Sequence, residues 1–204
     1  MGYLPEIHIP HKHLVKLNTV EGLEVGMDSL IVNSLRMRPD RVVVGEVRKK
    51  TEIHSFIDTI LAGQGRGSLC TFHAQSAQEA IHRFQSMGVQ EQDLNSIDLI
   101  IVLRRIAKGN IKSNKLTEKR KVIEVAEMLE AENKIKLNKL FEFDFKKDKL
   151  IRKNESIRIM KKILETFNCG AEELRKALDE RKDFFEKQKE TDFEELFEKL
   201  NSRE

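Results

Sequence analysis

Two residues of the chain combine side-chain types and positions that suit chemistry on a phosphate. Glu46 follows the apolar run Val42–Val44 and a glycine, and His73 follows the segment Ser68–Phe72 in "GSLCTFHAQS". A carboxylate placed in this way can orient an attacking water, and an imidazole can contact the phosphate that leaves. Taken singly, a glutamate at a strand end is more often a solvated or ion-paired residue, and a lone histidine is more often part of a core.

The elements around these residues are predicted to bring them to one edge of a sheet. Up to about Arg105, short apolar strands alternate with helices, a pattern typical of a parallel α/β sheet covered by helices on both faces. Ligands of such sheets bind beyond the carboxyl ends of the strands, where Glu46 and His73 would lie. The predicted strands are Val42–Val44, Ser68–Phe72 and Ile97–Leu103, and the predicted helices cover residues 27–35, 52–62 and 76–84.

Apolar stripes and a capping box support the predicted helices. Ser76 and Glu79 have the spacing of a capping box, in which two side chains satisfy free N–H groups at a helix start. In "EIHSFIDTILA" the helical period places on one face Ile53, Phe56, Ile57, Ile60 and Leu61. In "SAQEAIHRF" it predicts four buried apolar residues, namely Ala77, Ala80, Ile81 and Phe84.

The pattern changes after Arg105. "AKGNIKSNKLTEKRK" indicates a basic connector in the form of an exposed hairpin or loop, and "RKVIEVAEML" and "KIKLNKLFEFDF" alternate as amphipathic strands, with a short third strand at Leu150–Ile151. From Ser156 the pattern is helical, with Gly170 as a helix stop and a capping box at Thr191. We therefore predict three regions: an α/β core over 1–105, a connector with a small β element over 106–155, and a helical region over 156–204.

Composition excludes several classes of protein. The chain has 204 residues, of which 35% are charged and 39% hydrophobic, and its net charge of +3 is too small to indicate a nucleic-acid partner. The apolar run Leu99–Leu103 is too short to cross a bilayer, and no signal peptide is evident. Cys70 and Cys169 form no CxxC motif, which favours a reducing cytoplasm over a zinc ribbon.

A family resemblance is carried by "SLRMRPDRVVVGEVR" and "GSLCTFHAQSAQEAIHRF". These segments resemble the Walker B segment and the histidine box of the secretion-superfamily ATPases, the motors of type II and type IV secretion, type IV pili and archaella. The segment "AGQGRGS" and the absence of a CxxC zinc insert resemble the archaeal branch more than the bacterial type II branch. The resemblance implies a partial RecA-like α/β core in a hexamer that uses ATP and Mg²⁺ to move a membrane platform protein from the cytoplasmic face of the membrane.

The resemblance also implies roles for individual residues. Glu46 corresponds to the catalytic glutamate, which would meet Mg²⁺ through water, and His73 to the phosphate-sensing histidine. Arg36 and Arg38 are expected to form a subunit contact or to pair with the family's acidic box, with a helix-end ion pair as the simpler alternative. Further expected neighbours of the nucleotide are Gly45, Arg48, Gly67 and Thr71.

The largest departure from the family is the phosphate-binding loop. None of the ten glycines is followed by Lys and then Ser or Thr, so the pattern GxxxxGK[ST], whose backbone N–H groups and lysine hold the phosphates, is not in the sequence. Three expectations follow: a split motor whose P-loop half is a separate polypeptide, a truncated remnant, or a non-catalytic interaction or regulatory module. The split motor is preferred slightly, because the Walker B and histidine segments are intact.

Two other groups of residues could bind ligands. "HIPHKH" places His8, His11 and His13 together, but no cysteine or nearby aspartate completes a four-ligand metal set, and the family resemblance explains the segment as a surface strand. A basic cluster lacks aromatic residues for base stacking, so a solvated loop is favoured over contact with nucleic acid or lipid headgroups. Its members are Arg104, Arg105, Lys108, Lys112, Lys115, Lys119, Arg120 and Lys121.

Overall fold

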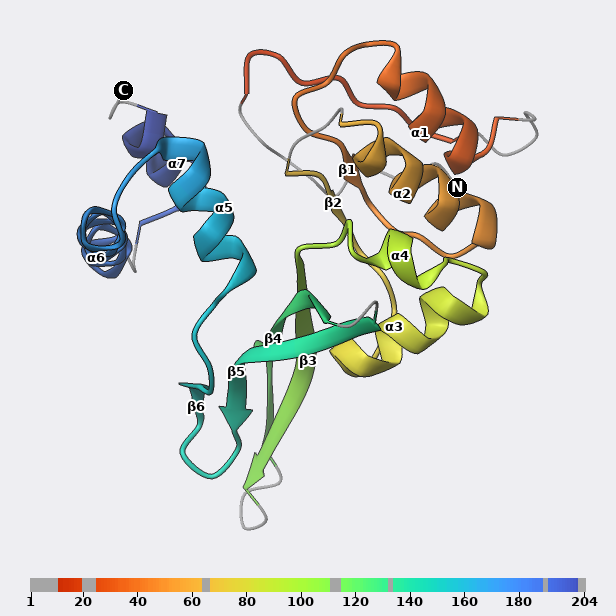
Figure 1. Cartoon of the computed structure of the whole chain (residues 1–204). Helices are drawn as coiled ribbons and strands as arrows, with labels where there is room; N and C mark the ends of the chain where they lie inside the picture. Colours follow the sequence, from red (N-terminus) through yellow and green to blue (C-terminus); the bar gives the residue numbers. More distant parts are fainter. Residues whose placement is uncertain are drawn as a thin grey trace. The chain divides into compact units, whose positions relative to one another are not determined.

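The computed structural model describes residues 11–19, 25–63, 67–110, 115–131, 134–188 and 191–201. The chain divides into two compact units, and residues 18–159 form the larger one. The C-terminal helices belong to the second unit. Figure 1 shows the course of the chain through the elements of each unit.

The first part of the larger unit contains a two-stranded parallel sheet. Strand β1 (Val43–Val44) pairs with β2 (Leu69–Cys70) in the register Val43 to Leu69 and Val44 to Cys70. The two strands are short, but backbone hydrogen bonds extend the pairing, from Leu69 N to Val42 O and from Val47 N to Thr71 O. The predicted parallel pairing of these two segments is confirmed.

Helices α1 (Met27–Leu35) and α2 (Lys50–Leu61) lie side by side next to this sheet (Figure 1). The predicted stripe of α2 is buried at Ile53, Phe56 and Ile57, whereas Leu61 is 54% exposed, contrary to the expectation from its spacing. Leu61 is the last residue of α2, so its side chain lies beyond the buried part of the apolar face.

Helix α3 (Ala77–Ser86) begins as the sequence predicts, and the short α4 (Glu91–Leu94) follows it. The Ser76 hydroxyl accepts a hydrogen bond from the Glu79 N–H at 3.1 Å. The Glu79 carboxylate accepts from the N–H of Gln75, one residue before the cap, rather than from Ser76 itself. The four apolar residues predicted to face the core are all buried, namely Ala77, Ala80, Ile81 and Phe84.

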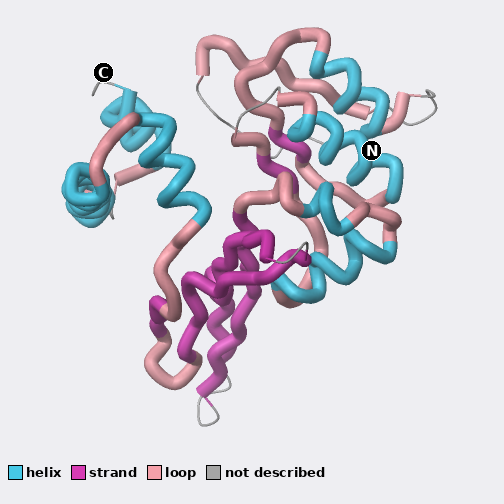
Figure 2. The backbone as a smooth tube through the Cα atoms, viewed as in Figure 1, coloured by secondary structure: helices cyan, strands magenta, loops and turns pink. Residues whose placement is uncertain are grey.

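A four-stranded antiparallel sheet in the order β3-β4-β5-β6 follows (Figure 2). Its strands are β3 (Leu99–Asn110), β4 (Lys115–Ala131), β5 (Lys134–Asp144) and β6 (Lys149–Arg152). The prediction that Ile97–Leu103 joins the parallel sheet is therefore wrong. The apolar run indicates a strand but no partner, and segments adjacent along the chain usually pair with each other.

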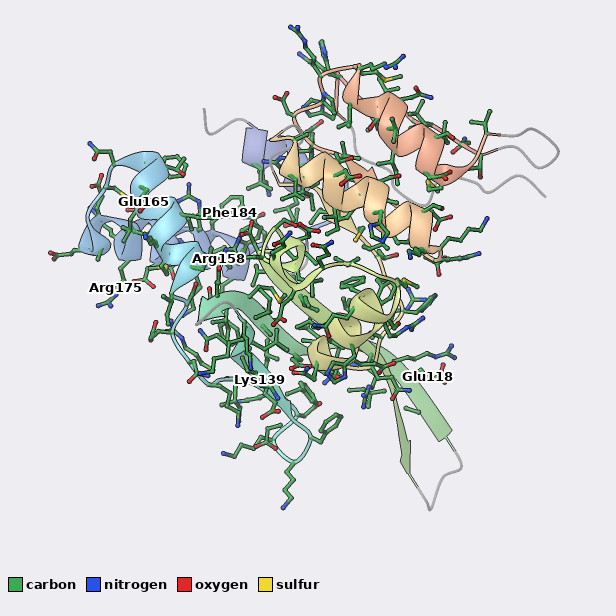
Figure 3. The ribbon with its side chains drawn as sticks, turned by 45° about the vertical axis from the view of Figure 1, so that its right-hand side comes forward. Glu118, Lys139, Arg158, Glu165, Arg175 and Phe184 are labelled. Atoms are coloured by element: carbon green, nitrogen blue, oxygen red, sulfur yellow. The ribbon has the colours of Figure 1, made fainter. Side chains whose placement is uncertain are left out.

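The basic connector is the outer part of the β3–β4 hairpin. Pairing continues from Ile106 opposite Lys119 to Asn110 opposite Lys115, so the hairpin alternative of the prediction is confirmed. Glu118, labelled in Figure 3, lies on this hairpin and forms an ion pair with Arg105. Lys112 lies outside the described residues.

The buried Glu127 and the partly buried Arg158 hold the end of the larger unit in place. The Glu127 carboxylate is fully buried on β4 and accepts hydrogen bonds from Asn138 Nδ2 at 2.8 Å, Ser156 Oγ at 2.8 Å and Ile157 N at 2.6 Å. Burial acts to raise the pKa of Glu127, but these hydrogen bonds outweigh it and hold that pKa below its ordinary value.

Arg158, labelled in Figure 3, forms a hydrogen bond and an ion pair with residues that follow α4. Its Nη1 donates to Asn95 Oδ1 at 2.5 Å, and its Nε lies 3.1 Å from Asp98 Oδ1. Within the larger unit, Glu127 thus bonds residues 156 and 157 to β4, and Arg158 bonds to the residues that follow α4.

The C-terminal region is helical, as predicted, with α5 (Arg158–Phe167), α6 (Ala171–Lys187) and α7 (Phe193–Asn201). The predicted helix stop at Gly170 differs from the structure. Helix α5 ends before Asn168, which has φ of 47°, and Gly170 is instead the N-cap of α6.

At α7 the cap lies one residue after the predicted Thr191. The Asp192 carboxylate accepts a hydrogen bond from Glu195 N at 2.9 Å, as an N-cap side chain does. None of the described helices is long and apolar enough to cross a membrane.

Candidate functional site

Glu46 and His73 meet beyond the carboxyl ends of β1 and β2. The Nε2 atom of His73 lies 2.6 Å from Oε1 of Glu46, and their side chains are 82% and 23% exposed, respectively. Parallel pairing of β1 with β2 brings the two residues to one edge, because both strands end there. The predicted juxtaposition is confirmed, whereas the catalytic roles of the two residues stay predictions.

Arg48 contacts the other oxygen of the same carboxylate. Its Nη2 pairs with Oε2 of Glu46, and this contact is the main reason why the pKa of Glu46 is lowered, with His73 adding to the effect. The main chain of this segment is fixed by Glu52 of α2, whose Oε2 accepts from Arg48 N at 2.7 Å and Lys49 N at 3.0 Å. Glu46 is therefore ionised and held by two cationic or polar side chains.

The predicted neighbours Gly45 and Thr71 lie at this edge as well. The Thr71 hydroxyl donates to the carbonyl of Gly45, which links the ends of the two strands. A Cβ atom built on Gly45 would meet nothing within 4 Å, so there is open space over Gly45. Gly67, with φ of 76°, precedes β2 and so lies at the opposite end of that strand from His73.

Arg36 and Arg38 follow α1, before β1, and are thus separated from the edge that holds Glu46. Both side chains are exposed, and neither forms an ion pair with a described carboxylate. The simpler alternative, a helix-end ion pair, is therefore not formed within the described part of the chain. Arg38 has φ of 52°, which turns the chain after α1.

The histidine segment shows no metal site in its described part. His8 lies outside the described residues, and the His13 N–H donates to Nδ1 of His11 at 3.1 Å. No group of three or more histidine, cysteine, aspartate or glutamate side chains able to hold a metal occurs among the described residues.

Three residues that sequence reasoning missed hold the segments that follow the two parallel strands, two of them after β2 and one after β1. Glu124 of β4 accepts from Ala77 N at 3.0 Å, Arg104 of β3 donates to the carbonyl of Gln75 at 3.1 Å, and Glu52 fixes the Glu46 side as described above. Glu124 and Arg104 are far from Gln75 and Ala77 in the sequence, so neither periodicity nor local motifs could reveal the contacts.

These residues fit one end of a magnesium nucleotide. An ionised carboxylate, an exposed imidazole and open space over Gly45 suit a water molecule and a terminal phosphate. The chain offers no GxxxxGK[ST] sequence for the other phosphates. A polar cavity of about 460 Å³ elsewhere in the larger unit is lined by neither Glu46 nor His73, and it includes Glu91, Glu130 and Lys134.

Comparisons with known proteins agree with the resemblance in the motifs. The chain is 51% identical over 65 residues to an uncharacterized protein of Methanocaldococcus jannaschii, a match that covers 29% of this chain and 9% of that protein. It is 31% identical over 119 residues to the type IV secretion system protein VirB11 of Bartonella henselae, with 50% of this chain and 33% of that protein covered.

A third relative is the conjugal transfer protein TrbB of Rhizobium radiobacter, 30% identical over 114 residues, with 51% of this chain and 33% of that protein covered. The matches thus span at most about a third of these three relatives. The family model described as "Type II/IV secretion system protein" matches residues 5–191. Since this match includes nearly all of the chain, with both strand ends of the site, the chain belongs to the type II/IV secretion system protein family.

Proposed function

We propose that the chain is the part of a hexameric secretion or filament-assembly ATPase that carries the catalytic glutamate and the phosphate-sensing histidine. The observation that carries this proposal is the 2.6 Å contact between Glu46 and His73 at the ends of two parallel strands. Membership of the secretion family adds the class of substrate, a magnesium nucleotide.

Each side chain has a role that its chemistry supports. The Glu46 carboxylate orients the attacking water, and its low pKa keeps it ionised as an acceptor. The His73 imidazole, which is largely exposed, donates to the terminal phosphate as negative charge develops there. Arg48 holds the carboxylate on its second oxygen. Magnesium, when bound with ATP, supplies neutralisation of phosphate charge.

The phosphate cradle must come from outside these 204 residues, either from another segment of the same protein or from a separate polypeptide. Two features support this part of the proposal. The P-loop pattern is not in the sequence, and the β1–β2 sheet has an uncovered face on which Val43 is 44% and Leu69 63% exposed. Parallel sheets usually have both faces covered, so a further layer is expected there.

The remaining partners follow from the named relatives. Proteins named for conjugal transfer, competence and type IV secretion are among the similar proteins. We propose that the complete protein forms a homo- or hetero-hexamer and acts on a membrane platform protein from the cytoplasmic face.

Calorimetry and turnover measurements test the proposal together. The isolated chain is expected to bind MgATP weakly or not at all, because the phosphates lack their cradle. Addition of a P-loop segment from the same system is expected to produce tight binding and hydrolysis. Micromolar MgATP binding by the chain alone would contradict the need for that segment. A complex that binds MgATP without hydrolysing it would favour the non-catalytic interaction module instead.

A further inference from the structure

We propose that Arg83 is a positioning residue for His73, which sets the imidazole against the Glu46 carboxylate by holding the His73 main chain. The inference rests on the proposed function for its consequence in catalysis. Its structural part, the dependence of the Glu46–His73 contact on Arg83, can be tested without any nucleotide.

Packing against other side chains does not fix the imidazole of His73. It belongs to the irregular segment between β2 and α3, and its side chain is 82% exposed. An exposed side chain samples several rotamers unless its backbone and its partner restrict it. The 2.6 Å approach to Glu46 therefore requires that the main chain of His73 be fixed by another group.

Arg83 supplies that fixed point from the body of α3. Its Nη1 donates a hydrogen bond to the carbonyl oxygen of His73. Among the described residues, Arg83 is the side chain that bonds the main chain of His73 itself. The segment after His73 is held separately, by Glu79 and Arg104 on the main chain of Gln75. Thus Arg83 holds the main chain of His73, whereas Glu79 and Arg104 hold that of Gln75, just before α3.

The guanidinium of Arg83 is itself oriented by an aromatic pair. Its Cζ lies 4.8 Å from the centroid of the Phe72 ring, a distance at which a cation interacts favourably with the ring face. The Phe72 ring lies 4.5 Å from the ring of Phe84, which is buried on α3. Through these rings the Arg83 guanidinium is packed against the core. Its planar shape suits both the stacking on Phe72 and the directed hydrogen bond to His73.

The arrangement ties two neighbouring residues of one segment to one side chain. Phe72 gives its ring and His73 its carbonyl, so Arg83 restrains the rotation of the chain between them. A purely structural role would stabilise α3 without any effect on the imidazole. A positioning role makes the contact between His73 and Glu46 depend on Arg83, and this difference is measurable.

The first experiment uses nuclear magnetic resonance on the complete 204-residue chain. The change in the His73 Cε1–H signal caused by Glu46→Gln is measured in the parent chain and in Arg83→Gln, Arg83→Lys and Arg181→Gln backgrounds. Arg181 is a matched control, because it also donates from Nη1 to a main-chain carbonyl, that of Ala177 at 3.1 Å. Thermal unfolding of each variant shows whether it remains folded.

We expect Arg83→Gln to remove most of the response of His73 to Glu46→Gln, and Arg181→Gln to leave it unchanged. Arg83→Lys keeps a charge and one donor but loses the planar fork, so an intermediate response is expected. If Arg83→Gln does not fold, the lysine variant still decides. An unchanged response in a folded Arg83→Gln chain, or in Arg83→Lys when the glutamine variant is unfolded, would overturn the proposal.

The second experiment measures turnover after a P-loop segment has been added. Arg83→Gln is expected to lower kcat by about 10-fold or more while KM for the nucleotide is unchanged, since a misplaced catalytic group affects the chemical step. Arg83→Lys should recover part of the loss. A parent-level kcat in Arg83→Gln would overturn the positioning role. A further outcome is that His73→Ala retains parent turnover while the response of the His73 signal to Glu46→Gln still depends on Arg83. In that case the proposed function fails and the structural inference stands.

Discussion

The imidazole of His73 lies 2.6 Å from the carboxylate of Glu46, and this contact joins the ends of two strands that are separated by helix α2 along the chain. The geometry provides an acceptor and a donor at one point of an exposed edge. Such a pair can act on the two ends of a phosphoryl transfer, the water and the terminal phosphate.

Substitution of either residue is expected to stop turnover while the fold remains intact. In a complex with a P-loop segment, Glu46→Gln should keep nucleotide binding and His73→Ala should keep the folded state, with turnover reduced by about 100-fold or more in each. Steady-state hydrolysis and thermal unfolding are the measurements. Parent rates in both variants would mean that the two residues are not catalytic.

Arg48 is expected to control the protonation of Glu46. The folded-state pKa of Glu46 is lowered chiefly by its hydrogen bond with Arg48, so Arg48→Gln should raise that pKa toward the ordinary glutamate value of about 4.3. A titration of the Glu46 carboxyl by ¹³C resonance measures the change. Arg105→Gln, which removes an ion pair on the β3–β4 hairpin, is the control and should leave the titration of Glu46 unchanged.

Two glycines near the site are expected to respond differently to alanine. Gly67 has φ of 76°, so Gly67→Ala should lower the free energy of unfolding by about 1 kcal/mol. Gly45 faces open space, so Gly45→Ala should leave stability unchanged but lower turnover in the complete motor by placing a methyl group in the open space over residue 45. Chemical denaturation and hydrolysis rates separate the two effects. Equal losses of stability would contradict this interpretation.

Glu127 is expected to make the larger unit sensitive to acid. Its folded-state pKa is lowered, so its contribution to stability is complete above about pH 4.3, the ordinary value, and is lost as the pH falls through the folded-state value. Glu127→Gln places an amide donor among donors, including Ile157 N at 2.6 Å, and should cost about 1–3 kcal/mol at neutral pH.

Unfolding free energies measured across this pH range test the prediction. The variant should lose the acid dependence that Glu127 gives to the parent chain. A substitution of Glu165, an exposed residue of α5 in an ion pair with Lys161, is a suitable control and should change little. If Glu127→Gln and the parent chain lost stability equally with falling pH, the assignment to Glu127 would be wrong.

The uncovered face of the parallel sheet is expected to cause association. Val43 and Leu69 are paired in register and are 44% and 63% exposed, so a second layer can pack on them. Sedimentation of the complete chain should show concentration-dependent association that Val43→Thr with Leu69→Thr reduces. A sharp monomer peak at all concentrations would instead indicate a chain that needs no further layer.

Several features were already determined by the sequence. The strand-like segments that end shortly before Glu46 and directly before His73, with the helix between them, predict two parallel strands with both residues at one edge, because a crossover connection makes neighbouring strands parallel. The stripe of α3 and the cap at Ser76 are local patterns, and local hydrogen bonds and periodic burial decide such features.

Only the tertiary structure decided the strand partner of Ile97–Leu103 and which charged residues reach the site. Ile97–Leu103 is apolar enough for either sheet, and its hairpin with β4 places it in the antiparallel one. Arg83, Arg104 and Glu124 hold the segment around His73 through main-chain contacts across the fold. A hydrogen bond from a side chain to a distant carbonyl or N–H leaves no spacing in the sequence, because any main-chain group can accept or donate it.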